Sequence, residues 1–109
     1  MSYDCGTITI SSGVATSAAL PADPHYKRAA GLLVAAPATL TQANATVQVS
    51  HDGGTTYNNL QSGGSDITLA QGDSAMITQL GFTHLRLNTT AGNEGADRAF
   101  TIRGIERPF

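Results

Sequence analysis

Three residue types that serve catalysis stand side by side at Ser50, His51 and Asp52. Such residues form a nucleophilic relay when each hydrogen-bonds to the next. Neighbouring residues of a strand point to opposite faces, so consecutive positions cannot form that relay. We interpret the tripeptide as a strand end followed by a turn aspartate, and the other two histidines, His25 and His84, lie in no catalytic motif. The sequence therefore predicts a non-enzymatic protein.

Acidic residues recur in or beside the expected turns, where clustered oxygens can hold calcium. An acid in a turn is also an ordinary partner of local backbone N–H groups, and the chain has no compact Asp-x-Asp-x-Asp loop. Gly53–Gly54 and Gly63–Gly64 lack the spacing of a phosphate-binding loop and are expected to be turn glycines. No metal and no cofactor is predicted. The acids concerned are Asp52, Asp66, Asp73, Glu94 and Asp97.

Aromatic residues are the remaining candidates for binding. A sugar-binding face needs exposed rings, and Tyr3, Tyr26 and Tyr57 could supply them. The simpler interpretation is that Tyr57 packs within its hairpin and Tyr26 anchors a proline-rich loop. Phe109, at the C-terminus, either folds back onto its own domain or docks on a neighbouring subunit, and the sequence leaves both open.

Charge is sparse, at 13% of the 109 residues, against roughly 25% in an average soluble domain. One Lys and two Glu argue against solvated helices, whose outer faces are rich in these residues. The six basic residues are scattered and the net charge is −2, so nucleic-acid binding is not expected. With no Trp, three Phe and three Tyr, the core must consist mainly of Val, Ile, Leu and Ala.

The single cysteine, Cys5, cannot form an internal disulfide, and it is expected to be a small residue near the N-terminus. The first residues show no basic region followed by an apolar run, so no signal peptide is predicted. The longest apolar stretch, residues 29–38, is too short to span a bilayer. We expect a soluble protein that is made in the cytoplasm and has no membrane partner.

Short alternating stretches separated by Gly-rich turns indicate β-strands. Pro21–Pro24 is expected to be a loop, and Asp52–Gly53 to be a tight hairpin turn. The spacing predicts one all-β domain over residues 1–109, an antiparallel two-sheet sandwich or jelly roll. The predicted strands are 7–10, 14–20, 29–36, 46–50, 55–60, 66–69, 74–78, 84–88 and 98–105. The residues expected to face inward are Ile8, Ile10, Val47, Val49, Ile67, Leu69, Met76 or its neighbours, Leu85, Leu87, Phe100 and Ile102.

Two segments carry a resemblance to known proteins. Residues 47–57, Val-Gln-Val-Ser-His-Asp-Gly-Gly-Thr-Thr-Tyr, resemble the strand, Asp-Gly-Gly and aromatic hairpin of small bacteriophage virion proteins. Residues 84–88, a Gly-rich loop and residues 100–105 are similar to the closing strand pair of jelly rolls in the discoidin and carbohydrate-binding superfamilies. Together these segments, with the loop, cover roughly a third of the chain.

The resemblance implies a decoration (cement) protein of a phage capsid, resident in the virion. Its expected partners are the major capsid protein and further copies of itself, as a trimer or dimer. Two alternatives remain: a carbohydrate-binding module of a phage tail or host-recognition device, and a tail or head–tail connector component. The residues expected to make contacts are Tyr3, His25, Tyr26, Lys27, Asn93, Glu94, Arg107 and Phe109.

Overall fold

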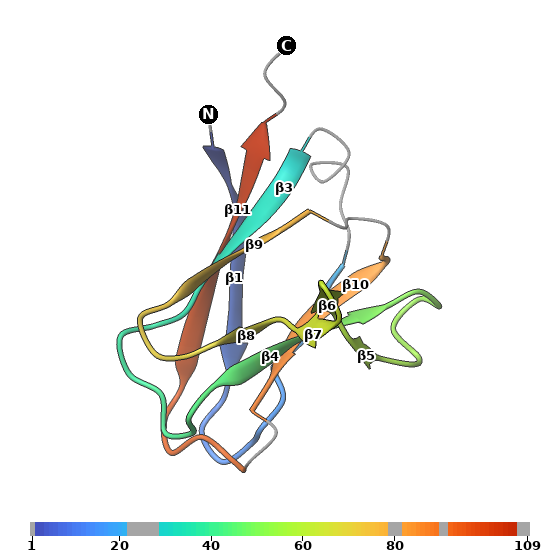
Figure 1. Cartoon of the computed structure of the whole chain (residues 1–109). Coiled ribbons are helices and arrows are strands. Elements are labelled where there is room, and N and C mark those ends of the chain that lie inside the picture. The colour runs from blue at the N-terminus through green and yellow to red at the C-terminus, as the bar shows by residue number, and fades with distance from the viewer. Residues whose placement is uncertain (1, 22–28, 79–81, 90–91, 107–109) are drawn as a thin grey trace.

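All regular structure in the described chain is β-structure (Figure 1). The computed structural model describes residues 2–21, 29–78, 82–89 and 92–106. This part of the chain contains no helix with the length and hydropathy that a membrane span requires. The strands are β1 (Ser2–Ile10), β2 (Leu20–Pro21), β3 (Ala29–Ala35), β4 (Ala45–Ser50), β5 (Asn58–Asn59), β6 (Gln61–Ser62), β7 (Ser65–Asp66), β8 (Thr68–Leu69), β9 (Ser74–Ile77), β10 (His84–Asn88) and β11 (Arg98–Glu106).

The strand order is that of a jelly roll. Sheet A has the order β1-β11-β3-β9, and sheet B has the order β2-β10-β4-β5, with β8 also paired to β4. The first four strands therefore pair with progressively earlier strands of the second half of the chain: β1 with β11, β2 with β10, β3 with β9 and β4 with β5, all antiparallel. This pairing of the first half with the second half, split over two sheets, confirms the predicted architecture.

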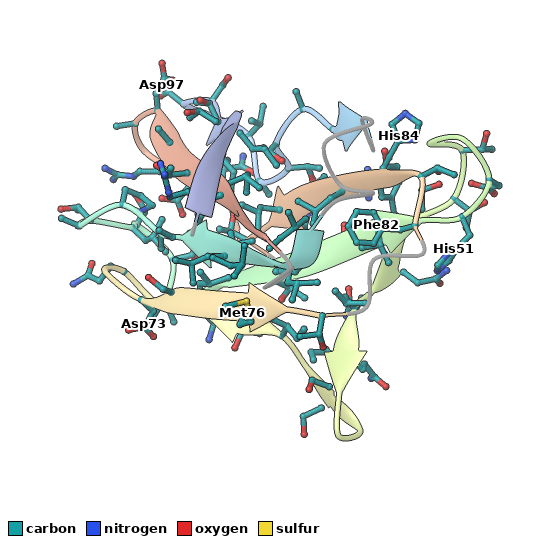
Figure 2. All side chains as sticks on the ribbon, turned by 90° about the horizontal axis from the view of Figure 1, so that it is seen from above. His51, Asp73, Met76, Phe82, His84 and Asp97 are labelled. Atoms are coloured by element: carbon teal, nitrogen blue, oxygen red, sulfur yellow. The ribbon has the colours of Figure 1, made fainter. Side chains whose placement is uncertain are left out.

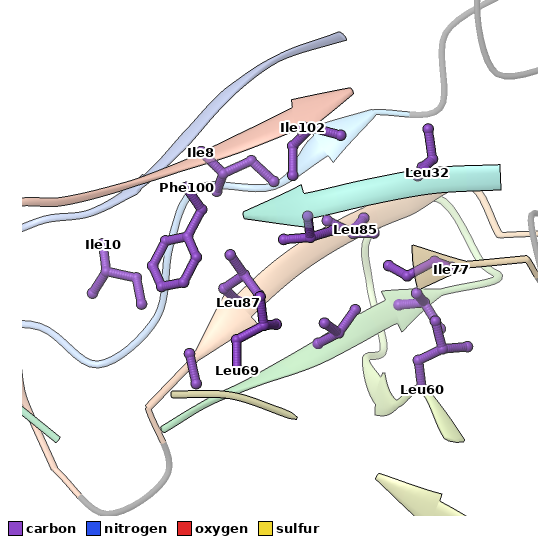
Figure 3. Close-up of a cluster of buried hydrophobic side chains, with 14 of the residues drawn as sticks. Ile8, Ile10, Leu32, Leu60, Leu69, Ile77, Leu85, Leu87, Phe100 and Ile102 are labelled. Atoms are coloured by element: carbon purple, nitrogen blue, oxygen red, sulfur yellow. The ribbon is translucent and has the colours of Figure 1, made fainter. Parts of the chain in front are cut away.

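The core lies between the two sheets and consists largely of aliphatic side chains (Figure 3). Ile8 of β1 lies opposite Phe100 of β11 in sheet A, and Leu87 of β10 lies opposite Val47 in sheet B. Alternate residues of each strand point inward, as a half-buried strand requires. The predicted inward positions are confirmed at Ile8, Ile10, Val47, Val49, Leu69, Leu85, Leu87, Phe100 and Ile102, which are buried, and at Ile67, which packs against them partly buried.

Met76 points outward. Met76 is 49% exposed, whereas its neighbour Ile77 is fully buried. Of the two alternatives predicted for this strand, the neighbour Ile77 is therefore the inward residue. The register explains this, because Ile77 lies opposite the buried Leu32 and Met76 lies opposite Leu33 on the outer face. A Cβ atom at Gly31 would lie 3.0 Å from Met76 Sδ, so this glycine leaves room for the methionine side chain to lie over β3 on the outer face.

The segment after β4 is longer than a tight turn. The return strand β5 contains only Asn58–Asn59, so residues 51–57 form a loop instead of the predicted strand that starts at residue 55. Gly53 and Gly54 have φ values of 79° and 94°, a region that favours glycine. The loop keeps this shape because the Ser50 hydroxyl and the Asp52 carboxylate bind its backbone N–H groups.

β1 starts at Ser2, five residues before the predicted strand, because its pairing with β11 continues to Ile105. The register shifts between Asp4 and Gly6, which leaves Cys5 as the extra residue of a β-bulge. The side-chain pattern of residues 2–6 does not alternate cleanly, so the sequence alone gave no sign of this extension.

Residues 14–20, predicted as one strand, run beside β10 in an irregular way. Only an isolated bridge between Thr16 and Asn88 and the short β2 are regular. The cause is Ser17, whose backbone N–H donates to the Leu87 carbonyl while its hydroxyl accepts the Leu87 N–H, each at 2.9 Å. A side-chain oxygen thus takes the place of a backbone carbonyl, which interrupts the ladder.

Replacing Ser17 with alanine leaves the buried N–H of Leu87 without its acceptor. We expect Ser17→Ala to lower the free energy of unfolding by about 1–3 kcal/mol, the cost of an unsatisfied buried donor. Urea denaturation followed by circular dichroism measures the change. Ser62→Ala, at an exposed position of β6, is the control and should stay within about 0.5 kcal/mol of the parent. Equal stability of the two variants would contradict this role for Ser17.

Candidate binding surfaces

Ser50 and Asp52 bond directly to each other, without the intervening histidine. The Ser50 hydroxyl donates to Asp52 Oδ1 at 2.7 Å, and Asp52 Oδ1 also accepts the N–H groups of Thr55 and Thr56. His51 is exposed, and no hydrogen bond joins its side chain to either neighbour. The arrangement is a loop clamp in which the aspartate binds backbone, as expected for a turn aspartate.

Hydrogen bonding favours the ionised form of Asp52. The Thr56 backbone N–H makes the largest contribution, followed by the Ser50 hydroxyl, and these bonds lower the pKa of Asp52 to about 2. The carboxylate is exposed, and with this pKa it stays ionised at neutral and mildly acidic pH. Its role is to hold residues 51–57 in one conformation.

The acidic residues are dispersed over the domain. Asp66 accepts from Asn59 and Gln61, and Asp97 accepts the Ser12 N–H at 2.8 Å. Figure 2 shows Asp73 and Asp97 at the end of the domain opposite His51 and His84. Within the described residues, no group of three or more His, Cys, Asp or Glu side chains is placed to hold a metal ion.

Glu94 is a buried carboxylate that joins three segments. Its Oε1 accepts the Thr41 N–H at 2.7 Å and its Oε2 accepts the Gln42 N–H at 3.0 Å, both in the connection between β3 and β4. The Arg98 Nε donates to Oε1 at 3.0 Å, at the start of β11. The backbone of Glu94 bonds to Gly13 and Val14 in the connection between β1 and β2.

This placement corrects the expectation that Glu94 contacts a partner protein. The residue is 1% exposed, and both carboxylate oxygens are occupied within the domain. Burial opposes ionisation of the carboxyl, but the N–H groups of Thr41 and Gln42 and the Arg98 guanidinium outweigh it and hold the pKa of Glu94 below its ordinary value. Glu94 is therefore a structural anion of the fold.

The other predicted contact residues are placed as follows. Asn93 is exposed, and its carbonyl accepts the Gln42 Nε2 group at 3.0 Å. Tyr3 belongs to β1, where its backbone lies opposite Gly104. His25, Tyr26, Lys27, Arg107 and Phe109 lie outside the described residues. The role of these residues as contacts remains a prediction.

The outer side of sheet B carries a continuous polar network, here called the B face. Arg86 Nε donates to Gln48 Oε1 at 2.8 Å, and Gln48 Nε2 donates to Asn59 Oδ1 at 3.0 Å. Asn59 Nδ2 then donates to Asp66 Oδ2 at 3.1 Å. The guanidinium of Arg86 lies 3.9 Å from the centre of the Tyr57 ring, so this ring packs within the hairpin region against a cation. The B face consists of Gln48, Tyr57, Asn59, Asp66, His84 and Arg86.

The outer side of sheet A, here called the A face, has a different character. Thr7, Thr101, Ala35 and Ser74 form one row across its four strands, in register. Leu33 and the exposed Met76 lie side by side in the next row. These side chains are small or apolar, and Arg103 is the charged residue among them. The A face consists of Thr7, Thr9, Leu33, Ala35, Ser74, Met76, Ala99, Thr101 and Arg103.

A shallow hollow lies between β9 and the β6–β7 hairpin, where Leu60, Ile67 and Met76 are among the lining residues. Its interior has space for about one water molecule. A small-molecule site needs several hundred Å³, so this hollow is too small for a substrate.

The fold and these faces define a small jelly-roll domain with two outer surfaces of unlike polarity. No protein-family model matches the sequence, and no curated protein matches it. Among solved structures, a similar chain comes from the work described as "Bacillus endospore appendages form a novel family of disulfide-linked pili". The match has a TM-score of 0.50 at 19% sequence identity, over 98% of this chain and 88% of that chain. At this identity the similarity establishes a common fold.

Glu94→Gln removes the charge that the three segments share. We expect the free energy of unfolding at pH 7 to fall by about 2–3 kcal/mol, because bonds from Thr41, Gln42 and Arg98 to a charged acceptor are weakened. The folded-state pKa is lowered, so this contribution is complete above the unfolded-state value of about 4.3 and is lost as the pH falls further.

The difference between parent and variant should therefore be constant above about pH 5.5 and shrink below about pH 4.3, as measured by urea denaturation across the range. Asp73→Asn, at an exposed turn, is the control and should change stability by less than about 0.5 kcal/mol. A parent–variant difference that stays the same from pH 7 to pH 3 would argue against this account.

Proposed function

We propose that the chain is a non-enzymatic structural protein that decorates the capsid of a bacteriophage particle through protein–protein contacts. The mechanism is burial of a flat sheet face across a junction between capsid subunits, which adds binding free energy that holds the shell together. The A face is the surface that makes this contact.

The character of the A face carries the proposal. Protein interfaces are depleted of charge at their centre and enriched in methionine, while their packing is close. Thr101 and Ala35 occupy the central strands of sheet A, flanked by Thr7 and Ser74, so this row across the face is uncharged. The charge of the A face is confined to Arg103, in the next row beside Leu33. Met76 provides a flexible apolar side chain, 49% exposed, at one edge. Such a face suits a large protein surface better than a small ligand.

The structurally similar chain belongs to pili described as disulfide-linked. These 109 residues contain one cysteine, Cys5. One cysteine forms one disulfide, which joins two copies but cannot extend a series of subunits. We therefore favour non-covalent attachment to a shell over a disulfide-linked polymer. Assembly that persists in reducing agent and in the Cys5→Ser variant is expected on this proposal.

The test is to mix the purified protein with capsids of the phage whose genome encodes it and to measure sedimentation of both. Light scattering of the protein alone gives its oligomeric state. Thr101→Lys places a charge at the centre of the A face, where a contacting subunit would bury it without a partner. We expect capsid binding to weaken at least tenfold, about 1.4 kcal/mol, with the folded state retained.

Thr68→Lys is the matched control, since Thr68 is also an exposed strand threonine but belongs to β8 of sheet B. It should bind capsids as the parent does. If Thr101→Lys and Thr68→Lys bind equally well, the A face is not the contact. If the parent protein does not co-sediment with capsids at all, the decoration function is wrong.

A further inference from the structure

The B face holds a cation that no carboxylate in the described chain neutralises. Arg98, by comparison, forms an ion pair with Glu94. The Arg86 guanidinium instead bonds through Nε to a neutral amide, Gln48, and stacks on Tyr57. Both contacts fix its plane and leave its terminal NH₂ groups without a bonded partner among the described residues. A planar guanidinium with two such groups matches the geometry of a carboxylate.

We infer that the B face binds a carboxylate-bearing sugar, with Arg86 anchoring the carboxylate. From Arg86 the polar network continues through Gln48 and Asn59 to Asp66, across three neighbouring strands and into the β6–β7 hairpin. Adjacent strands are about 4.8 Å apart, so the network is about as long as a disaccharide. This inference is independent of the proposed capsid contact, which uses the opposite sheet.

The chemistry of the network favours a sugar over a peptide. Arg86 is followed along it by the amides of Gln48 and Asn59 and then by the carboxylate of Asp66. Sugar hydroxyls can donate to and accept from the amides, and they can donate to the carboxylate. A peptide that adds a strand to the sheet would need an unpaired strand edge, but Arg86 lies on β10, which is paired on both sides, with β2 and β4. The row of side chains, not the backbone, is therefore what a ligand meets here.

The network is also held in place before any ligand arrives. Gln48 is fixed by its bonds to both Arg86 and Asn59, and Gln61 Nε2 donates to the same carboxylate of Asp66 at 2.9 Å. Tyr57 is the last residue of the loop 51–57. The Asp52 carboxylate stabilises this loop by accepting the N–H groups of Thr55 and Thr56. Preorganised polar groups lose little conformational entropy on binding, which favours affinity on an open face.

The experiment is titration of the full chain with a tetrasaccharide that contains glucuronic acid, followed by ¹H–¹⁵N NMR. The comparison ligand is the same tetrasaccharide with its carboxyl groups reduced to alcohols. We expect saturable shifts at the Arg86 Nε–H and at the side-chain amides of Gln48 and Asn59, with at least tenfold weaker binding of the reduced ligand. Equal binding of the two ligands, or shifts confined to sheet A, would overturn the inference.

Variants test the anchor separately. Arg86→Gln should weaken binding of the acidic tetrasaccharide at least tenfold. Arg86→Lys keeps the charge but loses the planar stack, so its affinity should lie between those of the parent and Arg86→Gln. Gln71→Glu is the control: it makes the same change in net charge at an exposed turn and keeps an oxygen acceptor for the Leu40 N–H. Unchanged affinity of Arg86→Gln would overturn the site. Tighter binding of a glutamate-rich peptide than of the tetrasaccharide would overturn the assignment to a sugar.

Discussion

The arrangement of the two sheets depends on the hydrogen bonds of one buried carboxylate, that of Glu94. A jelly roll passes its chain repeatedly from one sheet to the other, and the connections must meet without leaving buried backbone groups unpaired. Through its carboxylate and backbone, Glu94 binds residues 41–42 between β3 and β4 and residues 13–14 between β1 and β2. It lies itself in the connection from β10 to β11. Three crossings between the sheets therefore converge on one residue.

The junction at Glu94 extends to the residues around it. Arg98 pairs with Glu94 and also donates to the Thr41 hydroxyl, which bonds in turn to the Gly95 N–H. The fourth crossing, from β8 to β9, reaches the same end through Gly72 and Gln71, which bond to Pro37 and Leu40. Outside this junction the two sheets differ on their outer sides: sheet A carries small and apolar side chains with Arg103 among them, and sheet B carries a polar network.

The sequence predicted what depends on local alternation. His84–Asn88 was predicted with its observed bounds, and Leu85 and Leu87 point inward as expected, because a period of two residues identifies a half-buried strand. The sequence could not predict contacts that depend on register or on distant segments. Glu94 binds an N–H group 52 residues away, and nothing in a Gly-rich loop distinguishes a buried anion from an exposed one. The regular strand predicted around Ser17 does not form, because the Ser17 hydroxyl accepts the Leu87 N–H in place of a backbone carbonyl. This contact depends on β10, which the local sequence around Ser17 does not reveal.

The two faces also differ in how far the sequence reveals them. Alternation with the inward Leu85 and Leu87 implies that Arg86 points outward, and Tyr57 was expected to pack within its hairpin. Their stacking, however, requires the loop of residues 51–57 to fold back over sheet B. The Asp52 clamp and two glycines with positive φ produce that fold. On the A face, Met76 points outward because of its register with Leu33, and the missing side chain of Gly31 leaves room for its sulfur. Glycines therefore shape both surfaces, through positive φ at Gly53 and Gly54 and through the space left at Gly31. The side chains that this small domain presents are set in its turns and close contacts as much as in its strands.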